Sequence, residues 1–191
     1  MQTASNPINP PRRRRLWLLL VPFLSGCGGL PVEDQAGIGP DFDLFQFFDG
    51  ETQAWGIVQD WRGRVVRQFS ASIEGHVNAD ELTLDERFIY GDGETDTRVW
   101  KIRRGATGQY SGSANDIVGQ AQGRTHGNAL RWRYSMDLET GGRTVRVQFD
   151  DRLWRVDGDT LINRAAIRKF GIKVAEVTLF MRRQSVQPGA S

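Results

Sequence analysis

The stretch Leu130–Leu138, which reads LRWRYSMDL, decides the fold class. Apolar and aromatic residues occupy every second position, and polar or charged residues stand between them. This period of two is typical of a β-strand that buries one face, because successive side chains of a strand point to opposite sides. The stretch therefore predicts a strand with a buried face and a solvated face.

The same alternation extends over most of the chain. It is clear at Val99–Arg103 and Val145–Phe149 and weaker at seven further stretches. These are Trp55–Gln59, Val65–Val77, Leu82–Tyr90, Gln109–Asn115, Val118–Thr125, Thr160–Lys169 and Val174–Arg182. Thr160–Lys169 would also fit a short helix. Turn sequences such as Gly141-Gly142 are typical of hairpins.

Many strands joined by short turns predict an all-β fold, an antiparallel meander that is either closed into a barrel or folded into a sandwich. We favour a barrel of about eight to ten strands, because closure removes exposed strand edges and a barrel of that size can enclose one small ligand.

The N-terminal stretch Arg12–Cys27 is typical of an export signal. Four arginines precede the apolar run Leu16–Leu24, which is shorter than the roughly 20 residues that span a bilayer. Pro22 inside the run argues against a buried helix. The ending Leu24-Ser25-Gly26-Cys27 resembles a bacterial lipobox, which implies that Cys27 is lipidated. Since Gly28 and not an aspartate follows, we expect anchoring at the outer membrane, on its periplasmic face.

These features predict four segments. They are a lipoprotein signal peptide at 1–26, a lipidated cysteine with a Gly- and Pro-rich flexible tether at 27–41, a single barrel domain at 42–183 and a disordered tail at 184–191.

Charge argues against a nucleic-acid partner. Four of the 25 basic residues are Arg12–Arg15, so removal of the signal would leave 21 basic and 23 acidic residues and a formal charge of −2. The basic surface that nucleic acids require is therefore not expected. Cys27 is the only cysteine, so the fold depends on its core without a disulfide.

A series of short motifs follows in order along the predicted domain. They are WGIVQD at 55–60, VVRQF at 65–69, LDERF at 84–88 with Tyr90, Asp92, Gly93 and Glu94, RVW at 98–100, YSGSA at 110–114, GNAL at 127–130 with Trp132 and Tyr134, FDD at 149–151 and LINR at 161–164. Together they resemble the bacterial lipoprotein family catalogued as domain of unknown function 3833 (DUF3833). The resemblance implies a lipocalin-like, calycin-type barrel. Arg152-Leu153-Trp154 replaces the Trp-Met-Tyr-like run expected there.

The candidate ligand site combines aromatic and basic side chains. Inward aromatics of a barrel could line an apolar pocket, while an arginine meets a carboxylate or phosphate head group. The alternative is that the aromatics are core and the arginines form the solvated face, which the strict alternation favours for Arg131 and Arg133. The predicted ligand-binding residues are Trp100, Trp132, Tyr134, Asp151, Trp154 and Arg164.

Asp151 has two interpretations. Continuing the phase of Val145, Val147 and Phe149 carries Asp151 onto the apolar face, where a carboxylate needs a partner such as Arg164 or a polar pocket. Alternatively the strand ends or bulges there and the aspartate is exposed, which we slightly favour.

The sequence shows no catalytic signature, so we expect a protein that is not an enzyme. The only histidines, His76 and His126, have no metal-ligand spacing, and the acidic segment Asp92–Asp96 lacks the pattern of a calcium loop. We expect no catalytic residue, no metal ion and no cofactor.

The predicted function is an outer-membrane lipoprotein that binds or carries a lipid, a fatty acyl species or another apolar ligand in its barrel. The alternative is a structural or interaction lipoprotein with a packed barrel, no ligand and an envelope protein as partner.

Overall fold

The structure is a computed structural model that describes residues 39–184. Ten antiparallel strands follow a short helix, α1 (Leu44–Phe48). The strands are β1 (Gly50–Asp60), β2 (Val65–Asn78), β3 (Glu81–Tyr90), β4 (Thr95–Arg104), β5 (Gln109–Ala114), β6 (Ile117–His126), β7 (Ala129–Thr140), β8 (Arg143–Arg155), β9 (Thr160–Lys169) and β10 (Ile172–Arg183). The predicted signal peptide 1–26, Cys27, most of the tether and the tail beyond residue 184 lie outside the described residues.

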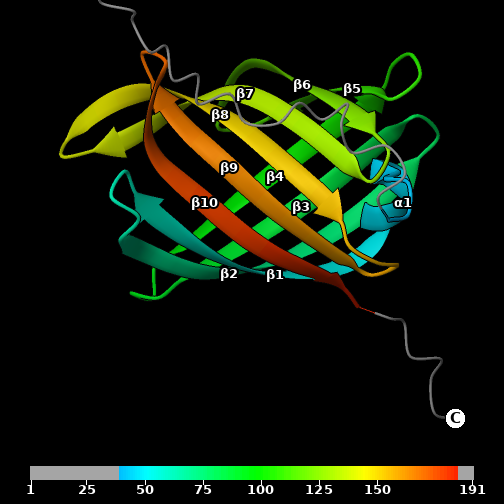
Figure 1. Cartoon of the computed structure of the whole chain (residues 1–191), viewed down its shortest axis with the longest axis horizontal. Coiled ribbons are helices and arrows are strands. Elements are labelled where there is room, and N and C mark those ends of the chain that lie inside the picture. Colours follow the sequence, from blue (N-terminus) through cyan, green and yellow to red (C-terminus); the bar gives the residue numbers. More distant parts are fainter. Residues whose placement is uncertain (1–38, 185–191) are drawn as a thin grey trace, which may run out of the picture.

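The strands form one closed barrel in which each pairs with its neighbours in the sequence (Figure 1). Closure comes from β1 and β10, whose pairing runs from Thr52 opposite Arg183 to Asp60 opposite Ala175. The prediction of an all-β, closed antiparallel barrel is confirmed, and every stretch with period two lies in a strand, apart from Asn115 in the turn directly after β5.

Thr160–Lys169 is a strand and not a helix. It forms β9, which pairs with β8 on one side and β10 on the other. Leu161, Asn163, Ala165 and Ile167 are all buried, and this spacing of two places them on the inner face of the barrel.

The two ends of the barrel differ. One end is covered by α1, at the right of Figure 1. At the other end the hairpins β1–β2, β3–β4, β5–β6, β7–β8 and β9–β10 make their turns, and we call this end the mouth. The β7–β8 turn is Gly141-Gly142, and both residues have positive φ, of 58° and 72°. Glycine adopts these angles without strain, as a tight turn between twisted strands requires.

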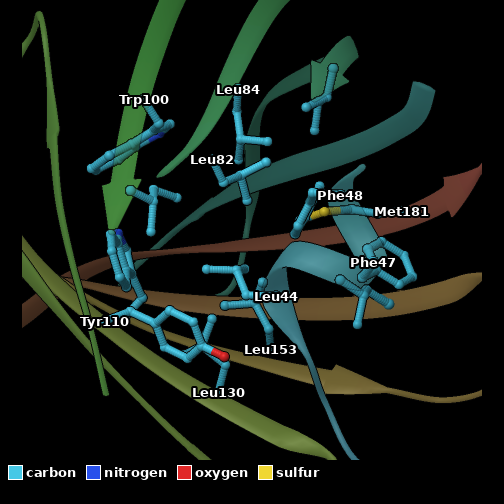
Figure 2. Close-up of a cluster of buried hydrophobic side chains, with 14 of the residues drawn as sticks. Leu44, Phe47, Phe48, Leu82, Leu84, Trp100, Tyr110, Leu130, Leu153 and Met181 are labelled. Carbon is cyan, nitrogen blue, oxygen red and sulfur yellow. The ribbon is translucent and has the colours of Figure 1, made fainter. Parts of the chain in front are cut away.

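Helix α1, which was not predicted from the sequence, closes the end of the barrel opposite the mouth. Its residues Leu44, Phe45, Phe47 and Phe48 are all buried. Figure 2 shows Leu44 above Leu130 and Leu153 of the barrel wall, and Phe48 beside Met181. A helix of this length is unstable alone, so burial of its apolar side chains in the barrel must stabilise it.

The carboxylate of Asp43 both caps α1 and ties it to the barrel. Its Oδ1 accepts hydrogen bonds from the backbone N–H groups of Phe45 and Gln46. The same side chain forms an ion pair with Arg104 at the end of β4, with an N–O distance of 3.0 Å.

We expect Asp43→Ala to lower the free energy of unfolding by about 1 kcal/mol, because it removes an N-cap. Asp43→Asn keeps an equally good cap and loses only the ion pair, so its effect should be about half as large or less, since the pair is partly exposed. Urea unfolding of both variants measures the difference. Equal losses for the two variants would show that the ion pair, and not the cap, holds α1.

No helix within residues 39–184 is both long and apolar enough to cross a membrane.

Candidate functional site

The barrel encloses a cavity of about 420 Å³. It reaches from Leu44 and Phe48 of α1 to Arg67, Tyr90 and Asp96 at the mouth. Asp96 is exposed and Tyr90 is half-buried, so the cavity meets solvent at the mouth. Binding sites for small ligands typically measure roughly 300–1,000 Å³. The barrel is therefore not packed solid with side chains, and its cavity has room for a small ligand.

One wall of the cavity is aromatic. The ring of Trp100 lies edge-on to those of Trp132 and Tyr134, with centroid distances of 5.6 and 5.3 Å. Phe149 stacks parallel to Tyr134 at 4.8 Å. All four line the cavity, because each takes an inward position on β4, β7 or β8. Such edge-to-face and stacked pairs stabilise one another and present a rigid apolar surface.

Two glycines make room for the Trp132 indole. A Cβ atom at Gly123 of β6 would lie 2.3 Å from the Trp132 ring, and one at Gly112 of β5 would lie 2.8 Å from it. Side chains at either position would push the indole away from the wall. The lack of a side chain at Gly112 and Gly123 thus fixes where Trp132 lies.

Next to this aromatic wall, toward the mouth, lies a charged cluster around Arg98, whose guanidinium carbon is 5.9 Å from the Trp100 ring centre. The guanidinium of Arg98 lies 2.7 Å from the Asp116 carboxylate and 3.9 Å from that of Glu86. Burial lowers the pKa of Arg98, but nearby Tyr134, Glu86 and Asp116 raise it more, so the pKa lies above its ordinary value and the group stays cationic. Arg98 is therefore already balanced by protein carboxylates.

Glu86 and Asp151 are buried acids with strongly raised pKa values. Burial raises the pKa of Glu86 to about 7, although the charge of Arg98 lowers it in part. Burial likewise raises the pKa of Asp151 to about 8, although the positive charge of Arg98 lowers this pKa in part. At neutral pH Asp151 is therefore mostly uncharged and Glu86 is close to half-charged.

Asp151 is buried, which corrects the interpretation that we slightly favoured from the sequence. It is 8% exposed, and β8 continues through it to Arg155 with the inward phase intact. Within the described chain, Oδ1 of Asp151 and Oδ1 of Asn163 have no hydrogen-bond partner. Both residues line the cavity, on neighbouring strands β8 and β9. A buried polar atom without a partner is unfavourable, so these two oxygens form a polar position that a ligand can satisfy.

The cavity brings together four of the six predicted site residues and excludes two. Trp100, Trp132, Tyr134 and Asp151 line it. Trp154 and Arg164 do not line it, which corrects their placement: each follows an inward residue on its strand and so points outward. Arg164 is exposed and pairs with Glu176 of β10, not with Asp151.

The arginines next to the aromatic residues in the sequence divide between the two faces of the wall. Arg131 points outward and makes a two-pronged ion pair with Asp150, with both N–O distances at 2.7 Å. Arg133 is exposed on the same face. The solvated-face interpretation therefore holds for both, whereas Arg98 lies inside.

Glu86 and Asn163 also line the cavity and were not predicted from the sequence. Both stand in phase with buried apolar neighbours: Glu86 follows Leu82 and Leu84 at intervals of two, and Asn163 lies between Leu161 and Ala165. A polar residue on an otherwise apolar face was the signal that could have identified them.

The arrangement can bind an apolar body against the aromatic wall and hydrogen-bond a polar end. Because the pKa values of Glu86 and Asp151 lie near neutrality, each can also hold or release a proton at physiological pH. Over residues 39–184, no cluster of His, Cys, Asp and Glu side chains has the geometry to hold a metal ion.

A family model described as "protein of unknown function (DUF3833)" matches residues 21–183, which is most of the sequence. The chain belongs to the DUF3833 family. The family resemblance inferred from the short motifs is thereby confirmed. No curated protein matches this DUF3833 chain in sequence.

Among solved structures, the chain resembles the S-type phycobiliprotein lyase CPES from Guillardia theta. The two share 9% sequence identity and a TM-score of 0.55, over 75% of this chain and 92% of the lyase. At this identity the likeness establishes a shared lipocalin-like fold. It also corrects the prediction that the protein is not an enzyme, because the matching barrel belongs to a lyase.

Proposed function

We propose that this DUF3833 protein binds a mainly apolar ligand, a lipid or another molecule with an acyl chain, inside the barrel. One observation carries the proposal: a cavity of about 420 Å³ has an aromatic wall and two buried side-chain oxygens that lack partners. An apolar body buried there gains free energy in proportion to the area removed from water. The lipocalin-like fold shared with CPES is consistent with a binding role.

The polar end of the ligand is uncharged in this proposal. A carboxylate or phosphate would lie near Glu86, Asp116 and Asp151, and Arg98 is already paired with the first two. At pH 8, Glu86 with a pKa of about 7 is mostly ionised and Asp151 with a pKa of about 8 is about half ionised, so an anion buried beside them would be repelled by like charge. A hydroxyl or amide can instead hydrogen-bond to Asp151 and Asn163. This replaces the sequence-based idea that an arginine meets an anionic head group.

The test compares two alanines that are adjacent on β9. Ala165 lies opposite Asp151 and lines the cavity, whereas Ala166 points outward. Residues 28–191 are purified and analysed by native mass spectrometry with dodecanol and with dodecanoate at pH 8. We expect Ala165→Phe to lose on the order of tenfold in dodecanol affinity, and Ala166→Phe to keep it. Thermal unfolding verifies that both variants are folded.

Three results would contradict the proposal. The first is equal dodecanol binding by Ala165→Phe and the parent protein, which would place the ligand outside the cavity. The second is tighter binding of dodecanoate than of dodecanol, which would reverse the charge argument. The third is no bound lipid in any form. Extraction and mass analysis of the bound lipid also reveal whether the protein has altered it chemically.

We further propose that the barrel is held at the periplasmic face of the outer membrane through lipidated Cys27. The support is the order of the arginines, the apolar run and the lipobox-like ending in Arg12–Cys27, with Gly28 after the cysteine. A myristoyl chain alone binds membranes only reversibly, so a stable anchor requires a second chain. Labelled palmitate should enter the expressed protein and be lost in Cys27→Ser. Equal labelling of both forms would refute the anchor.

A further inference from the structure

Two hairpin tips at the mouth expose large aromatic side chains. Trp61, in the β1–β2 turn, is 66% exposed, and Phe170, in the β9–β10 turn, is 92% exposed. Strands β1 and β10 pair with each other, so the two tips belong to neighbouring hairpins at the same end of the barrel (Figure 1). Ile172, beside Phe170, is 71% exposed. These side chains contribute little to the core, because most of their surface stays in water.

Phe170 has an unfavourable backbone conformation in addition to its exposed side chain. Its φ is 51°, and Gly171 follows with a φ of 80°. This left-handed pair is the usual geometry of a two-residue hairpin turn, where asparagine or glycine takes the first position without strain. A phenylalanine there is both strained and solvated, so neither turn geometry nor core packing explains it.

Each exposed ring has a cation from its own turn beside it. The guanidinium carbon of Arg62 lies 4.5 Å from the Trp61 ring centre, and the Lys169 Nζ lies 5.6 Å from that of Phe170. Residues 60–64 and 168–173 together hold five basic residues and one acid, Asp60. Of the five, Arg64 pairs with Asp60, and Lys173 pairs with Glu176. The two tips therefore carry an excess of positive charge.

The mouth is asymmetric in charge. The β3–β4 turn, which lies beside the β1–β2 tip on the side away from the β9–β10 tip, holds Asp92 and Glu94, both of which form ion pairs with Arg67. The basic and aromatic tips thus occupy one arc of the mouth, and an acidic turn occupies another. An anionic surface would be attracted to the first arc and repelled by the second.

We propose that the tips at Trp61 and Phe170 dock the mouth of the barrel onto an anionic phospholipid surface. Aromatic rings partition into the interfacial region of a bilayer, and lysine or arginine side chains near the surface are attracted by anionic head groups. Exposed rings beside cations match both requirements at once. Docking in this orientation turns the open end of the cavity toward the acyl chains of the bilayer. The docking surface stands independently of the ligand proposed above.

The experiment uses the full chain and attaches one dye to either the mouth or the closed end of the barrel. In a Cys27→Ala background, a polarity-sensitive dye is attached through Val66→Cys near the mouth or through Asp80→Cys in the β2–β3 turn at the closed end. Vesicles contain phosphatidylcholine with or without phosphatidylglycerol, and brominated acyl chains act as quenchers. Comparison of the two dye positions separates docking by the mouth from any attachment by the N-terminal segment, which would not favour the mouth.

We expect quenching at position 66 in phosphatidylglycerol vesicles and much weaker quenching at position 80. Trp61→Ser together with Phe170→Ser should weaken the vesicle interaction detected at position 66 on the order of tenfold. Lys169→Gln should weaken it about fivefold. Phe180→Ser removes an exposed aromatic from the barrel wall away from the mouth and should leave quenching unchanged.

Three outcomes would overturn the proposal. They are equal quenching at both positions, quenching at position 66 that is as strong in pure phosphatidylcholine, and quenching that survives the double serine variant. Binding of dodecanol in the absence of vesicles is measured on the same variants. If the ligand proposal is wrong and docking is right, dodecanol fails to bind while quenching at position 66 persists.

Discussion

Replacing Gly75 with alanine will dislodge α1 from the closed end of the barrel and lower the free energy of unfolding by about 3 kcal/mol. A Cβ atom at Gly75 would lie 1.6 Å from the carbonyl oxygen of Phe48 and 2.8 Å from its carbonyl carbon. Both are backbone atoms, so no rotation of a side chain can relieve the clash. Either α1 or β2 must move, and the buried side chains of α1 would lose contacts.

Urea unfolding measures this loss, and hydrogen exchange of the α1 amides locates it. Gly91→Ala is the matched control, because a Cβ atom there would meet its nearest neighbour, the carbonyl oxygen of Gln68, at 3.6 Å. That substitution should change stability by less than about 0.5 kcal/mol. If Gly75→Ala is as stable as Gly91→Ala, α1 does not lie against β2 as the structure describes.

The second large effect is on the pH dependence of stability. Burial raises the pKa of Asp151 to about 8 and that of Glu86 to about 7, whereas both ionise near pH 4 in an unfolded chain. Between about pH 4 and 8 the folded state therefore binds more protons than the unfolded state. The stabilisation from these groups is complete below about pH 4 and is lost as the pH rises through 7 and 8. We expect stability to fall as the pH rises.

Asp151→Asn should remove most of this dependence. A shift from 3.8 to about 8 corresponds to a change of order 5 kcal/mol between pH 4 and pH 9. We therefore expect Asp151→Asn to be more stable than the parent protein by a few kcal/mol at pH 9 and close to it at pH 4. Urea unfolding at both pH values measures the difference.

Asp137→Asn is the control for the direction in which stability changes with pH. Asp137 is exposed, and its hydrogen bond with Arg146 holds its pKa below the ordinary value. Its contribution to stability is therefore present above its ordinary pKa and lost as the pH falls, which is the opposite direction. If the stability of the parent protein rises from pH 5 to pH 9, Asp151 and Glu86 ionise freely and are not buried as the structure describes.

The same titration bears on ligand binding. Above about pH 8 both Asp151 and Glu86 carry charge, and the polar end of the cavity becomes anionic. An uncharged lipid would then compete with water for charged oxygens, so its affinity should fall as the pH rises. Asp151→Asn separates the two effects, because it keeps a hydrogen-bonding side chain at the same place and does not titrate.

Much of the architecture could be predicted from local pattern alone. Period two in stretches such as Leu130–Leu138 predicts strands and tells which side chains of one strand share a face. Turn residues such as Gly141-Gly142 mark where the chain reverses. These features act between neighbours in the sequence, so no knowledge of distant contacts is needed. The β8 phase also carries Asp151 inward, as the structure shows, although we slightly favoured an exposed Asp151 from the sequence.

Only the tertiary structure decided which strands face one another and what lies between them. Arg98, Asp116 and Glu86 are brought together by the pairing of β3 with β4 and by the turn after β5, and α1 becomes a helix only because the barrel end buries it. Trp154 and Arg164 were misplaced since their residue types, and not their phase, suggested a site. Local pattern fixes the face of each strand, whereas burial, raised pKa values and unpartnered oxygens depend on groups from other strands, which meet only when the barrel closes.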